Sequence, residues 1–316
     1  MRVVSVPLRA RFRGVTERQA VLFRGPAGWG EFSPFLEYDD DECVPWLRAA
    51  LAAARQPFPT PVRKRVPVNT TVPAVGAGRA HELVSASGCG TAKVKVAEPG
   101  QSLAEEIARL EAVRAALGSE GRIRVDANGG WDLDTARRVL PELDRAAGGL
   151  EYAEQPCSAV DDLASLRRGL DIPIAADESI RKTGDPEAVV RAQAADVVVL
   201  KVQPLGGVHA CLELAERLGL PVVVSSALET SVGIAAGVAL AAALPELPHA
   251  CGLGTVSLAQ NDVAAEPLIP VDGALRARRA EPDGSPCPAP PDVEEWWRER
   301  VVRVARLAGE DLSDVE

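Results

Sequence analysis

Only five of the chain's 35 basic residues are lysines, namely Lys64, Lys93, Lys95, Lys182 and Lys201. Arginine supplies positive charge equally well, but only lysine can lose its proton near neutral pH and act as a base. Lys93, Lys95 and Lys201 lie inside or at the end of short apolar runs. We therefore take these three as candidate acid–base or electrostatic groups, and we interpret Lys64 and Lys182, in polar loop-like sequence, as surface charge.

Three acidic residues, Asp126, Glu154 and Asp177, end other short apolar runs. If a fold brought them together in a cleft of low dielectric constant, their charges would repel strongly. Oxygen ligands from separate strands, with positions left for water or substrate, suit a Mg²⁺ ion. One such acid alone would more often cap a strand or pair with a base. Three in consecutive runs, with lysines on both sides, predict a Mg²⁺ site.

Lysines beside a magnesium ion indicate one class of reaction. The ordinary lysine pKa of about 10.4 has to fall to about 7–8 for base catalysis. A neighbouring ammonium group and a dication both push the pKa in that direction. With a carboxylate substrate on the metal and a lysine at its α-carbon, the expected step is removal of the α-proton, giving an enediolate whose charge the cation holds.

From residue 66 onward, short apolar runs alternate with amphipathic helical segments, and this alternation must position the candidate residues. Helices are predicted at 103–117, 134–146, 208–218 and 234–244. The predicted strands are 66–72, 92–97, 123–127, 150–154, 172–176, 197–202, 222–226 and, more weakly, 250–253. Such alternation predicts an α/β fold with a buried parallel sheet, and eight units predict closure into a TIM-type (β/α) barrel. An open doubly wound sheet is the alternative, although no GxGxxG motif opens a helix.

In a β/α barrel the active site lies where the carboxyl ends of the strands meet. Lys95, Asp126, Glu154, Asp177 and Lys201 follow one another at intervals of 31, 28, 23 and 24 residues, about one β/α unit each. Successive strands therefore each deliver one ionisable group to the same mouth. Lys93, two residues before Lys95, is expected on the same strand face.

The segments outside the barrel predict a smaller capping unit. Residues 1–65 form a predicted α+β unit with strands at 2–11 and 19–23, a turn-rich stretch at 24–34 and a helix within 40–55. Residues 66–264 are the predicted catalytic barrel. Residues 265–316 contain a predicted helix at 293–307. We expect this C-terminal segment to pack back on the N-terminal unit and form one capping domain with it.

Composition limits the classes of function. The chain is 47% hydrophobic and 25% charged, as soluble globular proteins are, and its net charge of -10 argues against nucleic-acid or anionic-membrane partners. It has no apolar run of about 18 residues and no signal-peptide pattern, so we expect a cytoplasmic protein acting on a small molecule. Six cysteines without a CxxC motif, and three histidines without zinc-like spacing, are interpreted as reduced thiols and unrelated imidazoles.

Five motifs in order resemble the enolase superfamily, specifically its muconate-lactonising subgroup with Lys-x-Lys on strand two and lysine on strand six. They are AKVKV, RVDANGGW, EYAEQPC, IAADESI and VLKVQPLGG, with GWGEFSP in the capping unit. The resemblance extends from about residue 28 to residue 255. It implies a Mg²⁺ cofactor, a small carboxylate substrate and metal ligands at Asp126, Glu154 and Asp177. The Asp-x-Asp of dipeptide epimerases at strand eight is absent.

Within the subgroup, the short chain, RVDAN, VVVSSALETS and CGLGT are similar to the o-succinylbenzoate synthase family of menaquinone biosynthesis. This resemblance implies a lyase that dehydrates 2-succinyl-6-hydroxy-2,4-cyclohexadiene-1-carboxylate, with Lys95 as base and then acid and Lys201 as electrostatic partner on the opposite ring face. The implied substrate-binding residues are Lys93, Arg124, Asn128, Ser225, Ser226, Gly252 and Gly254. The serines and glycines could equally serve close backbone packing.

Two other functions remain open. An N-acylamino acid racemase, acting for example on N-succinylamino acids, resembles this constellation because Lys95 and Lys201 would face opposite sides of one α-carbon. The ionisable groups do not separate the two reactions, and length slightly favours dehydration. A non-catalytic or phosphate-binding barrel relying on Gly252 and Gly254 would leave three acids and three lysines unexplained. We expect a monomer or a weak homo-oligomer.

Overall fold

The structure, a computed structural model, describes residues 1–12, 14–284 and 287–316. Its centre is a curled sheet of seven parallel strands in the order β11-β10-β9-β8-β7-β6-β5, so each strand pairs with its neighbours in sequence. The strands are β5 (Thr70–Val72), β6 (Thr91–Lys95), β7 (Arg122–Asp126), β8 (Tyr152–Glu154), β9 (Ile174–Ala176), β10 (Val197–Lys201) and β11 (Val222–Ser225).

The two edges of this sheet are joined by Cys251 and Gly252. The Gly252 amide donates to the Val224 carbonyl at 2.8 Å, and the Cys251 amide donates to the Pro67 carbonyl at 2.8 Å. Parallel bridges pair Ser225 with Gly252 and Val68 with Cys251. In place of the predicted eighth strand there are thus only two bridged residues, but they connect the two edges of the sheet. The prediction of a TIM-type barrel is confirmed, and the open doubly wound alternative is wrong.

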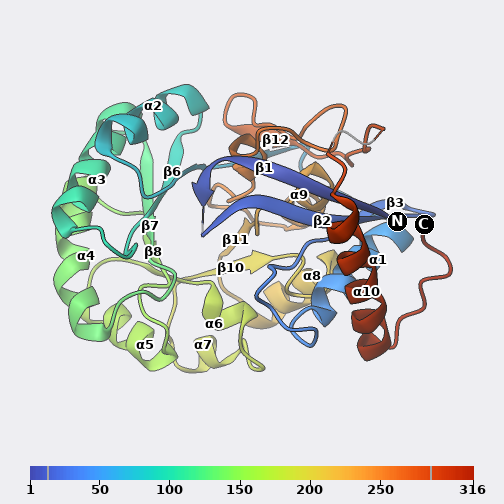
Figure 1. The fold of residues 1–316 in the computed structure, drawn as a ribbon. Helices are drawn as coiled ribbons and strands as arrows, with labels where there is room; N and C mark the ends of the chain where they lie inside the picture. Colours follow the sequence, from blue (N-terminus) through green and yellow to red (C-terminus); the bar gives the residue numbers. More distant parts are fainter. Residues whose placement is uncertain (13, 285–286) are drawn as a thin grey trace.

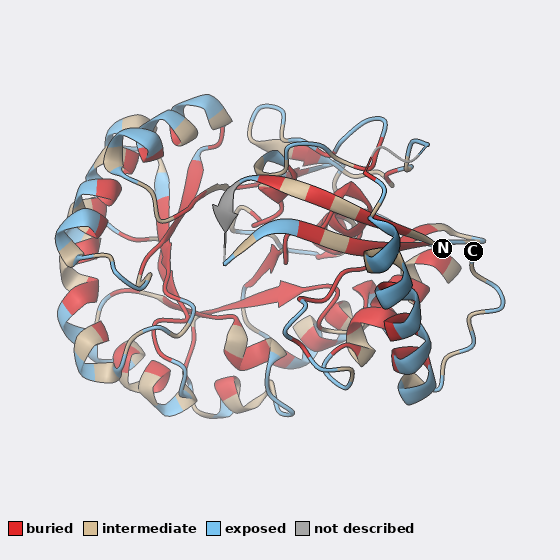
Figure 2. Cartoon of the chain, viewed as in Figure 1, coloured by how far each residue is buried: buried red, intermediate tan, exposed pale blue. Residues whose placement is uncertain are grey.

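A ring of helices surrounds the sheet (Figure 1). Their inward faces are buried and their outward faces exposed, whereas the strands are buried along almost their whole length (Figure 2). Helix α9 is apolar all round because other elements cover it, among them β3 of the capping unit. The helices are α2 (Ala77–Ser87), α3 (Leu103–Leu117), α4 (Leu133–Ala147), α5 (Val160–Gly169), α6 (Glu178–Arg181), α7 (Ala188–Arg191), α8 (Val208–Leu218) and α9 (Ser231–Ala243).

The predicted first strand, 66–72, is wrong as a single element. Its first part, β4 (Arg65–Pro67), pairs antiparallel with β12 (Ala274–Arg276), whereas β5 begins at Thr70. Pro67 has no amide hydrogen for a sheet ladder, which favours a break at this point. A short 3₁₀ helix, η1 (Gly254–Leu258), follows the closing bridges.

The capping unit consists of the antiparallel strands β1 (Arg2–Phe12), β2 (Val15–Gly25) and β3 (Gly28–Phe32), with helices α1 (Val44–Arg55) and α10 (Pro291–Ala308). Figure 1 shows α10 beside α1 and next to the capping strands. Trp297, Val301 and Val304 of α10 are buried in one core with residues of α1. The domain boundaries given above stay a prediction.

Strand β3 lies in the stretch that the sequence analysis expected to be turns, and that expectation was wrong. Its glycines allow close packing rather than a turn, because a Cβ atom on Gly30 would lie 1.9 Å from the Ala50 carbonyl oxygen of α1. Glycine is used in a strand where another backbone approaches closely. Glycine therefore suggested a turn where the structure has a strand.

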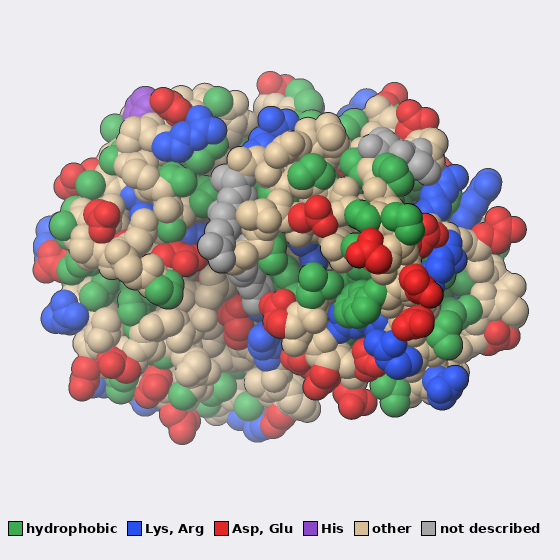
Figure 3. All heavy atoms as spheres, in the orientation of Figure 1, with side chains coloured by type: hydrophobic (Ala, Val, Ile, Leu, Met, Phe, Trp, Pro, Cys, Tyr) green, Lys and Arg blue, Asp and Glu red, His purple; other side chains and the backbone are tan. Residues whose placement is uncertain are grey.

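Charged side chains of both signs are interspersed over the face of the molecule in Figure 3. None of the helices in the described part of the chain is long and apolar enough to cross a lipid bilayer. All six cysteines are buried and free, which confirms the prediction of reduced thiols.

Candidate active site

Strand register places three of the predicted residues in one row and pairs two others across the barrel. Lys95 of β6 is the register partner of Asp126 of β7, and Asp126 is the partner of Glu154 of β8. Across the barrel, Lys201 of β10 is the partner of Ser225 of β11. Each of these residues ends its strand, so their side chains meet at the carboxyl-terminal mouth, as the spacing predicted.

The lysines of β6 form a compact cluster with two of the acids. The Lys95 Nζ atom lies 2.6 Å from Asp126 Oδ2 and 2.6 Å from Asn128 Oδ1. The Lys93 Nζ atom lies 3.0 Å from the same Asp126 oxygen and 2.8 Å from Glu154 Oε1. Lys93 and Lys95 therefore lie on one face of β6 and reach the same carboxylate.

A second cluster surrounds Asp177, which directly follows β9. The Lys201 Nζ atom lies 2.5 Å from Asp177 Oδ2, and the Arg181 Nε atom lies 2.9 Å from Asp177 Oδ1. Sequence analysis did not find Arg181. The signal was its place four residues after Asp177, one helical turn along α6.

Burial makes the charges of the cluster strongly dependent on one another. Burial opposes the ionisation of Asp126, but Lys93 and Lys95 hold its pKa well below its usual range. Burial likewise opposes the charge of Lys93, yet Asp126 and Glu154 hold the lysine pKa well above its ordinary value. Lys93 therefore stays an ammonium group, which suits holding a carboxylate rather than accepting a proton.

In two groups of the site, the pKa is shifted in the direction that favours the neutral form. Burial, reinforced by repulsion from Asp126, raises the pKa of Glu154 to about 7. Burial also lowers the pKa of Lys201, although Asp177 counteracts it. The sequence analysis expected a lowered pKa in the base lysine, caused by a neighbouring ammonium group and a dication; at Lys201 the cause is burial.

The three carboxylates suit a hard divalent cation. They lie on neighbouring strand ends and offer only oxygen ligands. Burial, with repulsion from Asp126 added to it, raises the pKa of Glu154 to about 7, and positive charge among the acids relieves the repulsion. In the described ranges, no three Asp, Glu, His or Cys side chains are gathered closely enough to form a metal cluster. Lysine ammonium groups pair with these acids instead. The Mg²⁺ ligands stay a prediction.

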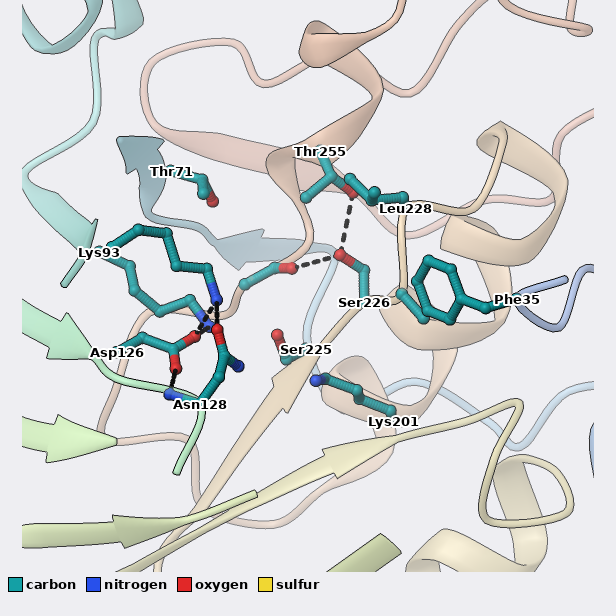
Figure 4. Close-up of a pocket in the computed structure, with 13 residues that line it drawn as sticks. Phe35, Thr71, Lys93, Asp126, Asn128, Lys201, Ser225, Ser226, Leu228 and Thr255 are labelled. Atoms are coloured by element: carbon teal, nitrogen blue, oxygen red, sulfur yellow. Dashed lines mark hydrogen bonds and ion pairs between the residues drawn. The ribbon is translucent and has the colours of Figure 1, made fainter. Parts of the chain in front are cut away.

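A cavity that is partly open to solvent lies at this mouth, and the empty space there, including the open solvent, is about 430 Å³. Figure 4 shows the Lys93, Asp126 and Asn128 side chains on one side of the cavity and Phe35 with Leu228 on the other. The sequence analysis missed five of its lining residues, which come from separate elements of the barrel and the capping unit and carry no ionisable group. These are Phe35, Thr71, Ala227, Leu228 and Thr255.

Five of the predicted substrate-binding residues line this cavity: Lys93, Asn128, Ser225, Ser226 and Gly252. A Cβ atom on Gly252 would lie 2.5 Å from Ser225 Oγ, so close contact with the Ser225 side chain also favours glycine here. Gly254 is not among the lining residues; it begins η1 and faces the Asn69 carbonyl and Pro270. The structure therefore argues against a substrate contact by Gly254.

Arg124 is also absent from the cavity lining, which argues against its predicted role as a substrate ligand. It is fully buried, and its Nε atom lies 2.7 Å from Glu151 Oε2, before the start of β8. Another guanidinium nitrogen donates to the Ala250 carbonyl at 2.8 Å. Arg124 is two residues before Asp126, so it points into the barrel one layer further from the mouth.

This position predicts that Arg124 contributes to stability and not to substrate affinity. Replacing it with methionine (Arg124→Met) should lower the free energy of unfolding by about 3–5 kcal/mol, because Glu151 loses a buried partner. The Arg122→Met variant is the control, since Arg122 contacts the same Glu151 carboxylate but its side chain is 59% exposed; the expected loss is under about 1 kcal/mol. Denaturant titration measures both, and a higher KM for Arg124→Met at unchanged stability would contradict the assignment.

Gln155 has a larger role than the sequence indicated. Its side chain is fully buried, and its Oε1 atom accepts hydrogen bonds from the backbone amides of Asp177 and Ser179 at 3.0 and 3.1 Å. Its Nε2 atom donates to Ser179 Oγ at 2.7 Å. Gln155 thus fixes the backbone that presents Asp177 to the site.

Comparisons with known proteins agree with this architecture. The family described as "Enolase C-terminal domain-like" matches residues 77–283, and "Enolase N-terminal domain-like" matches residues 3–54. An o-succinylbenzoate synthase of Thermobifida fusca is 62% identical over 89% of this chain and 88% of its own length. One of Mycolicibacterium smegmatis is 54% identical over 95% and 94%.

Solved structures of lower sequence identity share the fold. The L-Ala-D/L-Glu epimerase from Bacillus subtilis superposes with a TM-score of 0.75 at 22% identity, covering 91% of this chain and 98% of the epimerase. The 2-chloromuconate cycloisomerase from Rhodococcus opacus superposes with a TM-score of 0.73 at 24% identity, covering 95% and 97%. These similarities concern the fold alone.

Proposed function

Because the chain belongs to the enolase superfamily, we propose that it catalyses the reaction of its o-succinylbenzoate synthase relatives. This reaction is the syn dehydration of 2-succinyl-6-hydroxy-2,4-cyclohexadiene-1-carboxylate to 2-succinylbenzoate in menaquinone biosynthesis. The observation that carries the proposal is the high identity to these synthases, which extends over most of both chains. The enzyme is accordingly a carbon–oxygen lyase.

The lysines divide the chemistry between them. The Lys95 Nζ atom, in its neutral form, takes the proton from the carbon that bears the substrate carboxylate. The bond from carbon 6 to its hydroxyl then breaks, and Lys95 returns the proton to the leaving oxygen, so that water departs and the ring becomes aromatic. Because one group acts as base and then as acid, the departing proton and the departing hydroxyl must lie on the same face of the ring. An elimination of this geometry is a syn elimination.

The remaining residues stabilise charge and hold the substrate. Lys93, which keeps its charge, attracts the substrate carboxylate, and Lys201 places positive charge across the cavity. Mg²⁺ held by Asp126, Glu154 and Asp177 would supply further positive charge for the carboxylate oxygens. Asn128, whose Oδ1 atom lies 2.6 Å from Lys95 Nζ, orients the base. Ser225 and Ser226 are proposed to contact the succinyl chain.

The competing functions have less support. Lysines on two sides of the cavity are compatible with an N-acylamino acid racemase, but relatives named o-succinylbenzoate synthase match nearly the whole chain. A phosphate-binding barrel relying on Gly252 and Gly254 is disfavoured because Gly254 does not line the cavity. We infer a small-molecule carboxylate as the substrate and a cytoplasmic enzyme that acts without a nucleic-acid or membrane partner.

The proposal is tested by incubating the purified protein with the cyclohexadiene carboxylate and Mg²⁺ and following the aromatic product by absorbance. We expect turnover. A parallel reaction in D₂O with each enantiomer of an N-succinylamino acid measures deuterium entry at the α-carbon by NMR. Absence of aromatic product together with rapid deuterium exchange from both enantiomers would replace the synthase assignment with racemase activity.

A further inference from the structure

Arg18 of β2 connects the capping unit to the barrel beside the cavity. It is a buried side chain, 5% exposed. Within the capping unit its guanidinium donates to the carbonyl oxygens of Ser33 and, at 3.5 Å, Pro34. Within the barrel it donates to those of Ala227 at 3.1 Å and Leu228 at 3.4 Å. One cation thus holds two loops that are about two hundred residues apart.

The barrel loop that Arg18 holds is in an unusual conformation. Leu228 has a φ of 65°, in the left-handed region that a branched side chain rarely adopts. A strained backbone conformation persists only where surrounding contacts hold it in place, and such conformations are common beside ligand sites. Here Arg18 fixes the carbonyl groups of Ala227 and Leu228, while the Ala227 amide donates to Glu229 Oε2 at 2.6 Å.

The strained backbone directs an apolar side chain to the cavity. Leu228 and Phe35 both line it, and Figure 4 shows them together on the side away from Lys93 and Asp126. The Phe35 ring also lies against Arg18, whose guanidinium carbon is 4.3 Å from the ring centre. Phe35 and Leu228, which we call the apolar wall, are therefore both fixed by the same arginine.

A buried acid makes a second connection between the capping unit and the barrel. Glu31, in the GWGEFSP motif, accepts hydrogen bonds from Ser33 Oγ at 2.7 Å, Thr230 Oγ1 at 2.5 Å and the Gly233 amide at 2.9 Å. Ser33 in turn accepts a hydrogen bond on its Oγ atom from Gln203 at 2.9 Å. No residue of this motif has a proposed role in the reaction, and these contacts indicate that the motif joins the two units.

We propose that Arg18 is a positioning residue that sets substrate specificity by holding the apolar wall against the carbon body of the carboxylate substrate. The proposal rests on the proposed function, since it takes the substrate carboxylate to lie at the lysines. The cavity is charged where the lysines and Asp126 lie and apolar at the wall. It therefore selects a carboxylate whose body is long enough to span both sides.

The first test is a kinetic comparison of the wild type with Arg18→Met, using the cyclohexadiene carboxylate and Mg²⁺. We expect KM to rise on the order of tenfold and kcat to change less than about threefold, because the wall binds substrate and transition state alike. Arg18→Lys should recover only part of the affinity, since an ammonium group cannot reach several carbonyl groups as the guanidinium fork does. An unchanged KM would refute the proposal.

Arg300→Met is the matched control. Arg300 is a buried arginine of the capping unit, 2% exposed, that donates to the Tyr38 carbonyl and lies 3.4 Å from Asp40 Oδ1. Its removal should lower the thermal unfolding midpoint and leave KM unchanged. If Arg300→Met raised KM as much as Arg18→Met, the effect would reflect loss of a buried arginine in general.

A double mutant separates positioning from general stability. Glycine adopts the backbone conformation of Leu228 without strain, so in Leu228→Gly the loop no longer needs Arg18 to hold it and the wall has lost one member. We expect Arg18→Met to raise KM less than about threefold in that background. Fully additive effects on KM would show that Arg18 does not act through Leu228.

Hydrogen exchange tests the proposal independently of turnover. In substrate-free protein, the amides of residues 227–230 should exchange at least about tenfold faster in Arg18→Met than in the wild type. In Arg300→Met they should be unchanged. If the wild type fails to dehydrate the cyclohexadiene carboxylate but this exchange rises, the proposed function fails and the positioning role stands. Unchanged exchange at 227–230 refutes the positioning role whatever the activity.

Discussion

Replacing Lys95 with alanine should abolish turnover of the cyclohexadiene carboxylate while the protein remains folded. Proton transfer by a positioned side chain contributes about 10²–10⁴-fold to a rate, and Lys95 is proposed to transfer a proton twice. We therefore expect kcat to fall by at least about 10⁴-fold. The measurement is product absorbance at saturating substrate, with circular dichroism to verify folding. Arginine keeps the positive charge but cannot give up its proton, so Lys95→Arg should be equally inactive.

The matched control for this experiment is Lys182→Ala. Lys182 is exposed on the loop after α6, where its Nζ atom lies 5.0 Å from the centre of the Tyr38 ring. Its removal should leave kcat unchanged. Equal losses in Lys95→Ala and Lys182→Ala would refute the assignment of the site, and retained activity in Lys95→Arg would show that charge is sufficient.

Replacing Glu154 with glutamine should remove the response to Mg²⁺. In the wild type, Mg²⁺ at about one hundred times its dissociation constant should add about 2.7 kcal/mol to the free energy of unfolding. In Glu154→Gln one of three carboxylates is neutral, so this increment should largely disappear. We expect kcat/KM to fall by more than the roughly 10–100-fold typical of residues that only support metal ligands. Thermal unfolding with EDTA and with Mg²⁺ measures the first effect without relying on activity.

An acid that lies outside the cluster provides the control. Asp185 is exposed and pairs with Arg191. Asp185→Asn should keep the full stabilisation by Mg²⁺ and the full activity. If Glu154→Gln were still stabilised by Mg²⁺ as strongly as the wild type, Glu154 would not be a metal ligand. A wild type that EDTA neither inactivates nor destabilises would refute the metal site altogether.

The ionisable cluster could be predicted because most of its members end a strand. Lys95, Asp126, Glu154 and Lys201 follow apolar runs, and parallel strands with short connections place such residues at one end of the sheet. Their spacing of about one β/α unit carried the same information. Local pattern and global fold agree at these positions, so the sequence was sufficient to identify them.

Depth within the barrel was not predictable in the same way. Arg124 and Asp126 share a strand face, because alternate residues point to the same side. Two residues along a strand is nevertheless one layer of the barrel interior. Arg124 therefore pairs with Glu151 beneath the cavity, whereas Asp126 lines it. The strand periodicity predicts the face on which a residue lies. How near the residue lies to the mouth can be seen only in the assembled barrel.

The sequence by itself determined the order of the β/α units, the five charged groups at or just after the strand ends and, by resemblance, the family. Only the tertiary structure decided that Cys251 and Gly252 join the sheet edges, that Gly30 belongs to a strand, and that Phe35 and Leu228 form the apolar wall. The physical reason is range. Strand periodicity and strand ends follow from neighbouring residues, whereas close backbone approach and a wall assembled from two loops depend on contacts between segments far apart in the chain.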